Sequence, residues 1–106
     1  MKISTTDRLT DGEKINEVLG IARGSTVRSK NIIRDVLAMA KSIVGGEVKD
    51  YTKLQSESRE QAIERMKKDA EIMGADAGVC VRFMTSTITA GTSEIVAYGT
   101  AVKIGN

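Results

Sequence analysis

Basic residues around one glycine and two hydroxyl residues form the pattern in this sequence with the most evident chemistry. Guanidinium groups and the free N–H groups at a helix N-terminus both bind anions, and a helix is expected to begin shortly after this segment. A phosphate, nucleotide or carboxylate site is one interpretation, although the spacing matches neither a P-loop nor a dinucleotide fingerprint. The alternative is a bulged strand whose arginines pair with Asp35 or with glutamates of a neighbouring subunit. The candidate anion-binding residues are Arg23, Gly24, Ser25, Thr26, Arg28 and Arg34.

Metal ligands are scarce in this chain. Soft metals prefer thiolate and imidazole ligands, and the sequence has no histidine and one cysteine, Cys80. Cys80 stands between Val79 and Val81, where a strand is expected to bury a small side chain, although a ring of subunits could gather several copies of it on its axis. Glu47 and Asp50 could hold a hard cation or could be solvated in a turn between two helices. No cofactor is evident from these residues.

The composition argues against catalysis and against nucleic-acid binding. Histidine, the commonest general base, is absent, which excludes Ser-His and Cys-His nucleophiles. An enzyme that uses carboxylates is kept as a remote alternative, since no spacing singles out a pair. The 16 basic and 14 acidic residues give a net charge of +2, unlike the basic excess of a dedicated nucleic-acid binder. Tyr51, Phe83 and Tyr98 are the only aromatic residues, so there is little to stack on bases.

Three long extended segments would position these residues. Ile15–Val27 is rich in β-branched residues, and its glycines, Gly20 and Gly24, predict a bulge or a close backbone approach. In 79–84 the pattern alternates, which predicts that Val79, Val81 and Phe83 share one face of a strand. Residues 95–104 form the last predicted strand, after a turn at 90–92. A short edge strand is also expected within 1–6.

Two helices are expected between the first and second long strands. Apolar residues recur at helical spacing from Ile32 to Val44, and Gly45-Gly46 would end that helix. The second helix is predicted from Thr52 to Met73, because Thr52 and Gln55 fit a capping box and Gly74 would close it. The predicted fold is therefore α+β: a three-stranded antiparallel sheet in a split β-α-β-β arrangement, backed by two helices, with the last strand between the other two.

Both faces of the last strand are apolar, which implies that both are covered. The helices of one chain can cover one face of a small sheet. A neighbouring subunit is the economical cover for the other, because large exposed apolar patches are rare on monomers; the alternative is that the second helix wraps around an edge. We therefore expect a homo-oligomer.

Short motifs typical of one protein family lie along nearly the whole chain, from about Ile15 to Ile104. They are Glu17-Val18-Leu19-Gly20, Arg23-Gly24-Ser25-Thr26-Val27-Arg28, Asn31-Ile32, Arg34-Asp35, Ile43-Val44-Gly45-Gly46-Glu47, Tyr51-Thr52, Arg59, Ala62, Gly74-Ala75-Asp76-Ala77 and Ala97-Tyr98-Gly99-Thr100-Ala101-Val102. In order and spacing they resemble the signatures of the YbjQ-like family. The resemblance implies a dodecin-subunit-like fold assembled as a ring-shaped homopentamer, in which short extra strands help to join subunits. The family also carries a conjectural label of heavy-metal binding.

These observations lead to two functional hypotheses for a single domain, 1–106. The first is a non-enzymatic homo-oligomeric module that scaffolds a partner or binds a small anion. The second, which the family label implies, is a metal-binding protein. One cysteine fits a reducing compartment, residues 1–14 do not form a secretory signal, and the apolar runs are far short of the ~20 residues of a membrane span. A cytoplasmic protein with no membrane contact is therefore expected.

Overall fold

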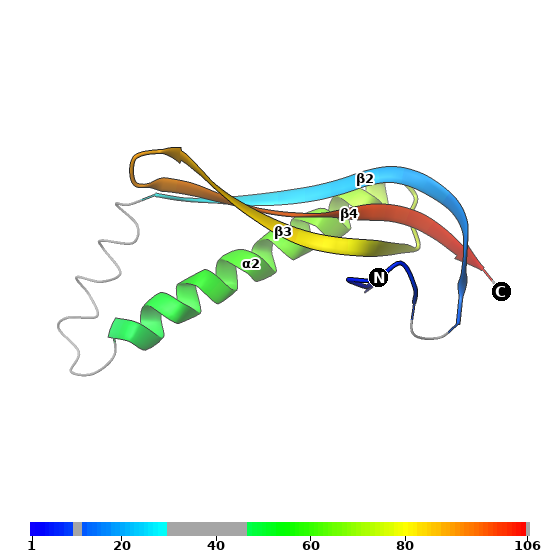
Figure 1. Ribbon diagram of the computed structural model, residues 1–106, viewed down its shortest axis with the longest axis horizontal. Coiled ribbons are helices and arrows are strands. Elements are labelled where there is room, and N and C mark those ends of the chain that lie inside the picture. The colour runs from blue at the N-terminus through cyan, green and yellow to red at the C-terminus, as the bar shows by residue number, and fades with distance from the viewer. Residues whose placement is uncertain (10–11, 30–46, 106) are drawn as a thin grey trace.

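The chain forms one sheet with a long helix packed across one of its faces (Figure 1). The computed structural model describes residues 1–9, 12–29 and 47–105, and for residues 29 and 47–55 it describes the backbone alone. The predicted helix from Ile32 to Val44 lies outside the described residues, as does Arg34. The described elements are β1 (Lys2–Ile3), β2 (Lys14–Ser29), α2 (Glu47–Ile72), β3 (Ala77–Thr89) and β4 (Thr92–Gly105).

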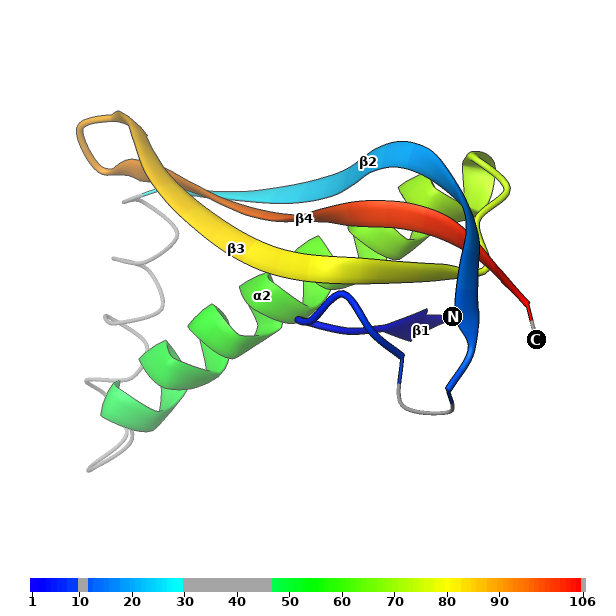
Figure 2. The ribbon, with the colours of Figure 1, turned by 45° about the vertical axis from the view of Figure 1, so that its right-hand side comes forward.

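The described part of the sheet has four strands, so the prediction of three strands, all antiparallel, was wrong. The order is β1-β3-β4-β2. β4 lies between β2 and β3 and is antiparallel to both, as predicted. The additional strand is β1, which pairs in parallel with β3 through Lys2 and Ile3. Figure 2 shows β1 beside β3. A two-residue strand is too short to produce a period-two pattern, so the sequence predicted an edge strand there but not its partner.

Two glycines in β2 let this strand bend and approach the helix, as predicted. Gly20 has a φ of +142°, and the register with β4 shifts between Val18 and Gly20. Gly24 lies against the α2 backbone: a Cβ at Gly24 would lie 2.5 Å from the Ala62 carbonyl oxygen and closer still to the Met66 amide nitrogen. Only a residue without a side chain allows the helix and the strand to come this close.

The helix begins earlier than predicted. It starts at Glu47, one and a half turns before Thr52, so Thr52 lies inside the helix and is not its N-cap; the turn expected around Glu47 and Asp50 is helical. The predicted end is confirmed, because Gly74 has a φ of +86° and the amide of Ala75 donates to the carbonyl of Ala70 over 3.0 Å. This bond is typical of a Schellman cap.

The alternation predicted for β3 fails at Cys80. This residue has a φ of +54°, and the register with β4 shifts between Val79 and Arg82, which defines a bulge with one residue in the left-handed region. Val79 therefore lies on the face opposite Val81 and Phe83 and not with them. A cysteine gives no sequence signal for a left-handed residue, because glycine and asparagine are the residues that usually occupy it.

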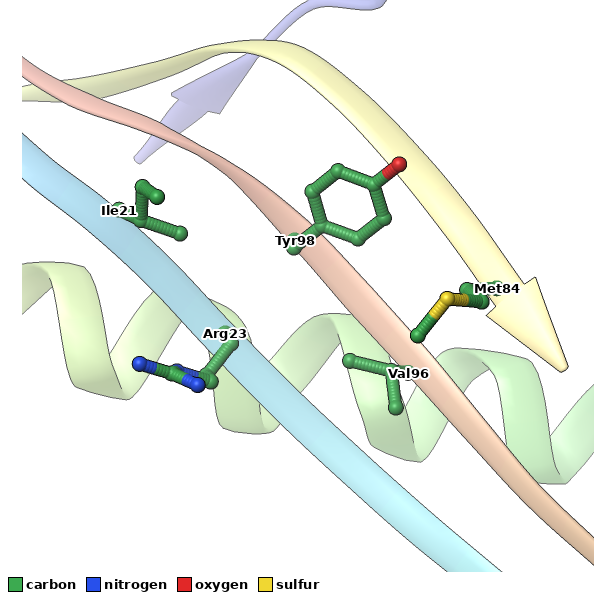
Figure 3. Close-up of a pocket in the computed structure, with 5 residues that line it drawn as sticks. All are labelled: Ile21, Arg23, Met84, Val96 and Tyr98. Atoms are coloured by element: carbon green, nitrogen blue, oxygen red, sulfur yellow. The ribbon is translucent and has the colours of Figure 1, made fainter. Parts of the chain in front are cut away.

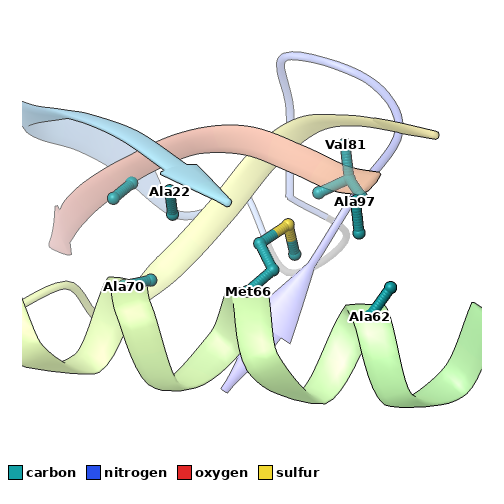
Figure 4. Packing of buried hydrophobic residues seen from close by; sticks show 7 residues of the cluster. Ala22, Ala62, Met66, Ala70, Val81 and Ala97 are labelled. Atoms are coloured by element: carbon teal, nitrogen blue, oxygen red, sulfur yellow. The ribbon is translucent and has the colours of Figure 1, made fainter. Parts of the chain in front are cut away.

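Two small cores lie on opposite faces of the sheet, and both include residues of β4. The first core packs between α2 and the sheet (Figure 4). It contains Ala22, Ala62, Met66, Ala70, Val81, Ala97 and Ala101. The second contains Leu9, Ala77, Val79 and Val102. The two apolar faces of β4 are thus both covered near its C-terminal end, one by α2 and the other by the chain's own N-terminal segment through Leu9.

Candidate functional site

The predicted anion-binding residues alternate between the two faces of β2. Arg23 pairs with Tyr98 and Ser25 with Val96, and these side chains lie on the face opposite α2, here called the open face. The intervening Gly24 is buried against α2. Thr26 and Arg28 also lie on the α2 side. The described residues of the cluster therefore do not converge on one site.

The members on the α2 side have structural partners. Thr26 is 1% exposed, and its hydroxyl donates to the side-chain oxygen of Gln61 over 3.4 Å. The Nε of Arg28 donates to the hydroxyl of Ser58, which is also buried, over 2.7 Å. These contacts join β2 to α2. Among the described members, Thr26 and Arg28 thus serve the packing of the helix.

The open-face members border a shallow hollow. It has a volume of about 280 Å³ and is lined by Ile21, Arg23, Met84, Val96 and Tyr98. Three neighbouring strands contribute: β2 the first two residues, β3 the methionine, and β4 the valine and the tyrosine (Figure 3). The lining is mostly apolar. Its polar groups are the Tyr98 hydroxyl and, at the rim, the guanidinium of Arg23, which Figure 3 shows directed away from Tyr98, Val96 and Met84. Such a lining suits a small ligand with an apolar body.

Side chains from α2 hold the edge of β2 beside this hollow. The backbone amide of Arg23 donates to a carboxylate oxygen of Asp69 over 3.0 Å, and the guanidinium of Arg65 donates to the carbonyl oxygen of Ser25. Both backbone groups face away from β4, where a strand edge would otherwise be unpaired. The helix thereby fixes Arg23 and blocks the addition of another strand at this point.

The metal candidates do not form a site within the described chain. Cys80 is half-buried in the β3 bulge and packs beside the second core. Glu47 and Asp50 lie in the first turn of α2, and their side chains are outside the described part. Among the described residues there is no group of three or more His, Cys, Asp or Glu side chains that could hold a metal ion. With no histidine and one thiol in the sequence, the donor set does not fit a soft heavy metal within one chain.

The hollow was not predicted from the sequence. The sequence pattern identified both faces of the last strand as apolar, but it did not connect Ile21 and Met84 with that strand. The connection depends on the register that sets Arg23 opposite Tyr98 and Met84 opposite Val96. Alternation within β2 could still have separated Arg23 from Arg28, because residues an odd number apart in an unbroken strand face opposite sides.

Comparison with known proteins identifies the family. The YbjQ family, described as "Putative heavy-metal-binding", matches residues 1–105. The chain belongs to this family. A UPF0145 protein of Methanosarcina acetivorans is 55% identical over 106 residues, covering 100% of this chain and 99% of the relative. A UPF0145 protein of Vibrio campbellii is 51% identical over 104 residues, covering 98% and 99%. The resemblance to YbjQ-like proteins is therefore confirmed, and these relatives' names assign no activity.

A solved structure shares the fold of this YbjQ-like chain. It is a crystal structure of a protein with unknown function, of the DUF74 family, from Pediococcus pentosaceus. The TM-score is 0.63 at 15% identity, over 99% of this chain and 98% of the other. At this identity the likeness concerns the fold alone. Within the described residues, no helix is both long enough and apolar enough to cross a membrane.

Proposed function

We propose that this YbjQ-like chain is a non-enzymatic, homo-oligomeric binding module in which neighbouring copies cover the open face of the sheet and a small anionic ligand binds there. The family resemblance gives a pentameric ring as the assembly. The observation that carries the proposal is the row of exposed large apolar side chains on that face. Val18 is 64% exposed, Ile21 66%, Val27 48% and Met84 53%.

The physical argument concerns what covers these side chains. α2 covers one face of the sheet along much of β2 and β4, and Leu9 of the N-terminal segment covers the other face beside Ala77, Val79 and Val102. From there to the β3–β4 turn, Ile21, Val27 and Met84 of the open face are exposed and Val96 is half-buried. Monomeric proteins rarely expose a contiguous apolar patch larger than a few hundred Å². Burial of such a surface stabilises an assembly by about 25 cal/mol per Å².

The non-enzymatic part of the proposal rests on the chemistry of the side chains. Acid–base and nucleophilic catalysis need groups held within hydrogen-bonding reach of each other. The polar side chains that approach β2, namely those of Ser58, Gln61, Arg65 and Asp69, contact the strand itself. They contribute to packing, and the hollow on the other face is bordered by apolar groups, the Tyr98 hydroxyl and one cation.

Native mass spectrometry of protein purified without a metal column tests the proposal. We expect a multiple of the 11.4 kDa subunit mass, five-fold if the ring is correct. Ile21→Glu places a charge in the open face and is expected to shift the mass to that of one chain. Ile72→Glu is the matched control, because Ile72 is 85% exposed at the end of α2. A wild-type monomer at micromolar concentration would overturn the proposal, as would an Ile21→Glu protein that assembles as well as the control.

A further inference from the structure

The hollow on the open face combines an apolar wall with one positive charge. Ile21, Val96 and Met84 contribute aliphatic and thioether groups, and Tyr98, which is 38% exposed, contributes a ring. Arg23 is the charged residue of the lining, and no carboxylate lines the hollow. A ligand that matches both parts carries a single negative head on an apolar body.

The guanidinium of Arg23 is available to such a head group. Within the described part of the chain, its side chain has no hydrogen-bond or ion-pair partner, whereas its backbone amide is held by Asp69. Arg82, on the other side of Tyr98, is already engaged, because its guanidinium donates to the carbonyl oxygens of Thr5 and Val81. Arg23 therefore presents a fixed backbone and an unpaired cation beside an apolar surface.

Competing negative charge is distant on the same face. Glu94 pairs with Val27 and Ser86, which places it on the open face. It lies four residues along β4 from Tyr98, a distance of about 13 Å at the rise of a strand. Glu94 is half-buried, and the separation exceeds the Debye length of about 8 Å at physiological salt, so its interaction with Arg23 is weakened. A closer carboxylate, that of Asp69, accepts from the backbone amide of Arg23 over 3.0 Å and not from its guanidinium, so the guanidinium is left for a ligand.

We propose that this hollow binds an organic monocarboxylate with a short aliphatic or aromatic body, whose carboxylate lies on Arg23 and whose body packs on Ile21, Met84, Val96 and Tyr98. The inference rests on the proposed function, because the hollow is open in one chain and a neighbouring copy on the open face forms its roof. The volume of about 280 Å³ accommodates about nine non-hydrogen atoms, if each takes the ~30 Å³ of a water molecule. Octanoate and 3-phenylpropionate are of this size.

The apolar wall distinguishes this ligand from inorganic phosphate. A phosphate ion has no apolar body, so it would leave Tyr98 and Ile21 in contact with water and would gain nothing from their burial. A charge-assisted hydrogen bond to Arg23 alone would hold it weakly in an exposed site. Octanoate uses both parts of the hollow and is expected to bind more tightly than phosphate.

Isothermal titration of the assembled protein with octanoate tests the inference. We expect octanoate to bind saturably. Octylammonium keeps the apolar body but reverses the charge of the head group, and acetate keeps only the head group. Both are expected to bind more weakly than octanoate. Arg23→Gln is expected to lower octanoate affinity by about ten-fold or more, since a hydrogen bond to a charged group is lost. Lys68→Gln, which removes one positive charge from an exposed position on α2, is expected to leave the affinity within about two-fold of wild type.

The outcomes separate this inference from the proposed function. If wild type and Arg23→Gln both assemble and only wild type binds octanoate, both ideas are supported. If both proteins assemble and neither binds octanoate or 3-phenylpropionate, the ligand inference is overturned and the assembly stands. The ligand inference is also overturned if Arg23→Gln binds octanoate as tightly as wild type does, or if wild type binds phosphate more tightly than octanoate. A wild-type monomer refutes the proposed function and removes the roof on which the ligand site depends.

Discussion

Replacement of Gly24 by alanine tests how closely β2 packs on α2. The new Cβ would lie 2.5 Å from the Ala62 carbonyl oxygen and 2.6 Å from the Arg65 carbonyl carbon. Ordinary contacts between such atoms are about 3.5 Å or longer, so α2 must move away by about 1 Å. A gap of that size forfeits about a quarter to a half of the dispersion energy across the contact. The three nearest atoms all belong to the α2 backbone, so rotation of a side chain cannot relieve the clash.

We expect Gly24→Ala to lower the free energy of unfolding by about 3 kcal/mol, at the upper end of the usual range for overpacking. For a domain of this size that corresponds to a fall in Tm of roughly 12–24 °C. Urea and thermal unfolding followed by circular dichroism at 222 nm measure both quantities. Protein concentration must be equal in every sample, because assembly contributes to apparent stability.

Gly78→Ala is the matched control. Gly78 is also a buried strand glycine, but a Cβ there would meet only ordinary contacts, 3.5 Å from a methyl group of Ile3 and 4.0 Å from the Thr100 carbonyl oxygen. Both substitutions reduce the entropy of the unfolded chain equally, so their difference isolates the clash with α2. A difference below about 1 kcal/mol would show that α2 does not lie as close to β2 as described, since overpacking typically costs at least that much.

Three further predictions concern other parts of the chain. Cys80→Val should destabilise the fold by about 2 kcal/mol more than Cys80→Gly, because a β-branched residue is strained at a φ of +54°; equal urea midpoints would contradict the bulge. Asp69→Ala should cost about 1 kcal/mol and speed hydrogen exchange at the Arg23 amide; unchanged exchange there would show that Asp69 does not cap the strand edge. Equilibrium dialysis against micromolar Zn²⁺ or Cu⁺ should give no bound metal above a chelator-treated control, because one chain has a single thiol and no imidazole; uptake of a fraction of an equivalent per chain that is lost in Cys80→Ala would indicate a metal site shared between chains.

The sequence predicted the elements whose periodicity is long and regular. Apolar residues on both faces of the last strand indicated a central strand covered on both sides, and β4 holds that position between β2 and β3. The second predicted helix was also confirmed over most of its length, and Ala62, Met66 and Ala70, at helical spacing within it, are buried. The residue types did not determine where α2 starts, because Thr52 is compatible with a helix interior as well as with an N-cap.

The candidate site was harder to predict because it depends on register. Arg23 and Arg28 are close in the sequence and lie on opposite faces of the sheet, so proximity along the chain was misleading. Ile21 and Met84 are 63 positions apart and meet only because β4 aligns both strands. The bulge at Cys80 determines which residues of β3 reach each face, and a cysteine does not indicate a left-handed conformation. A one-residue shift in register would have placed a different set of side chains around the hollow.

The pairing of β2 with β4 has a consequence for the order in which the protein is made. Lys14 pairs with Gly105 and Ser29 with Thr92, so the partner of β2 is translated after all the other described elements. At ribosomal rates of about 5–20 residues per second, the roughly 60 intervening residues take about 3–12 s to translate. During that interval β2 has been synthesised but β4, the strand to which it hydrogen-bonds, has not. The apolar side chains of Val18, Ile21 and Val27 lie along β2. A chaperone that recognises extended apolar segments would meet this strand first.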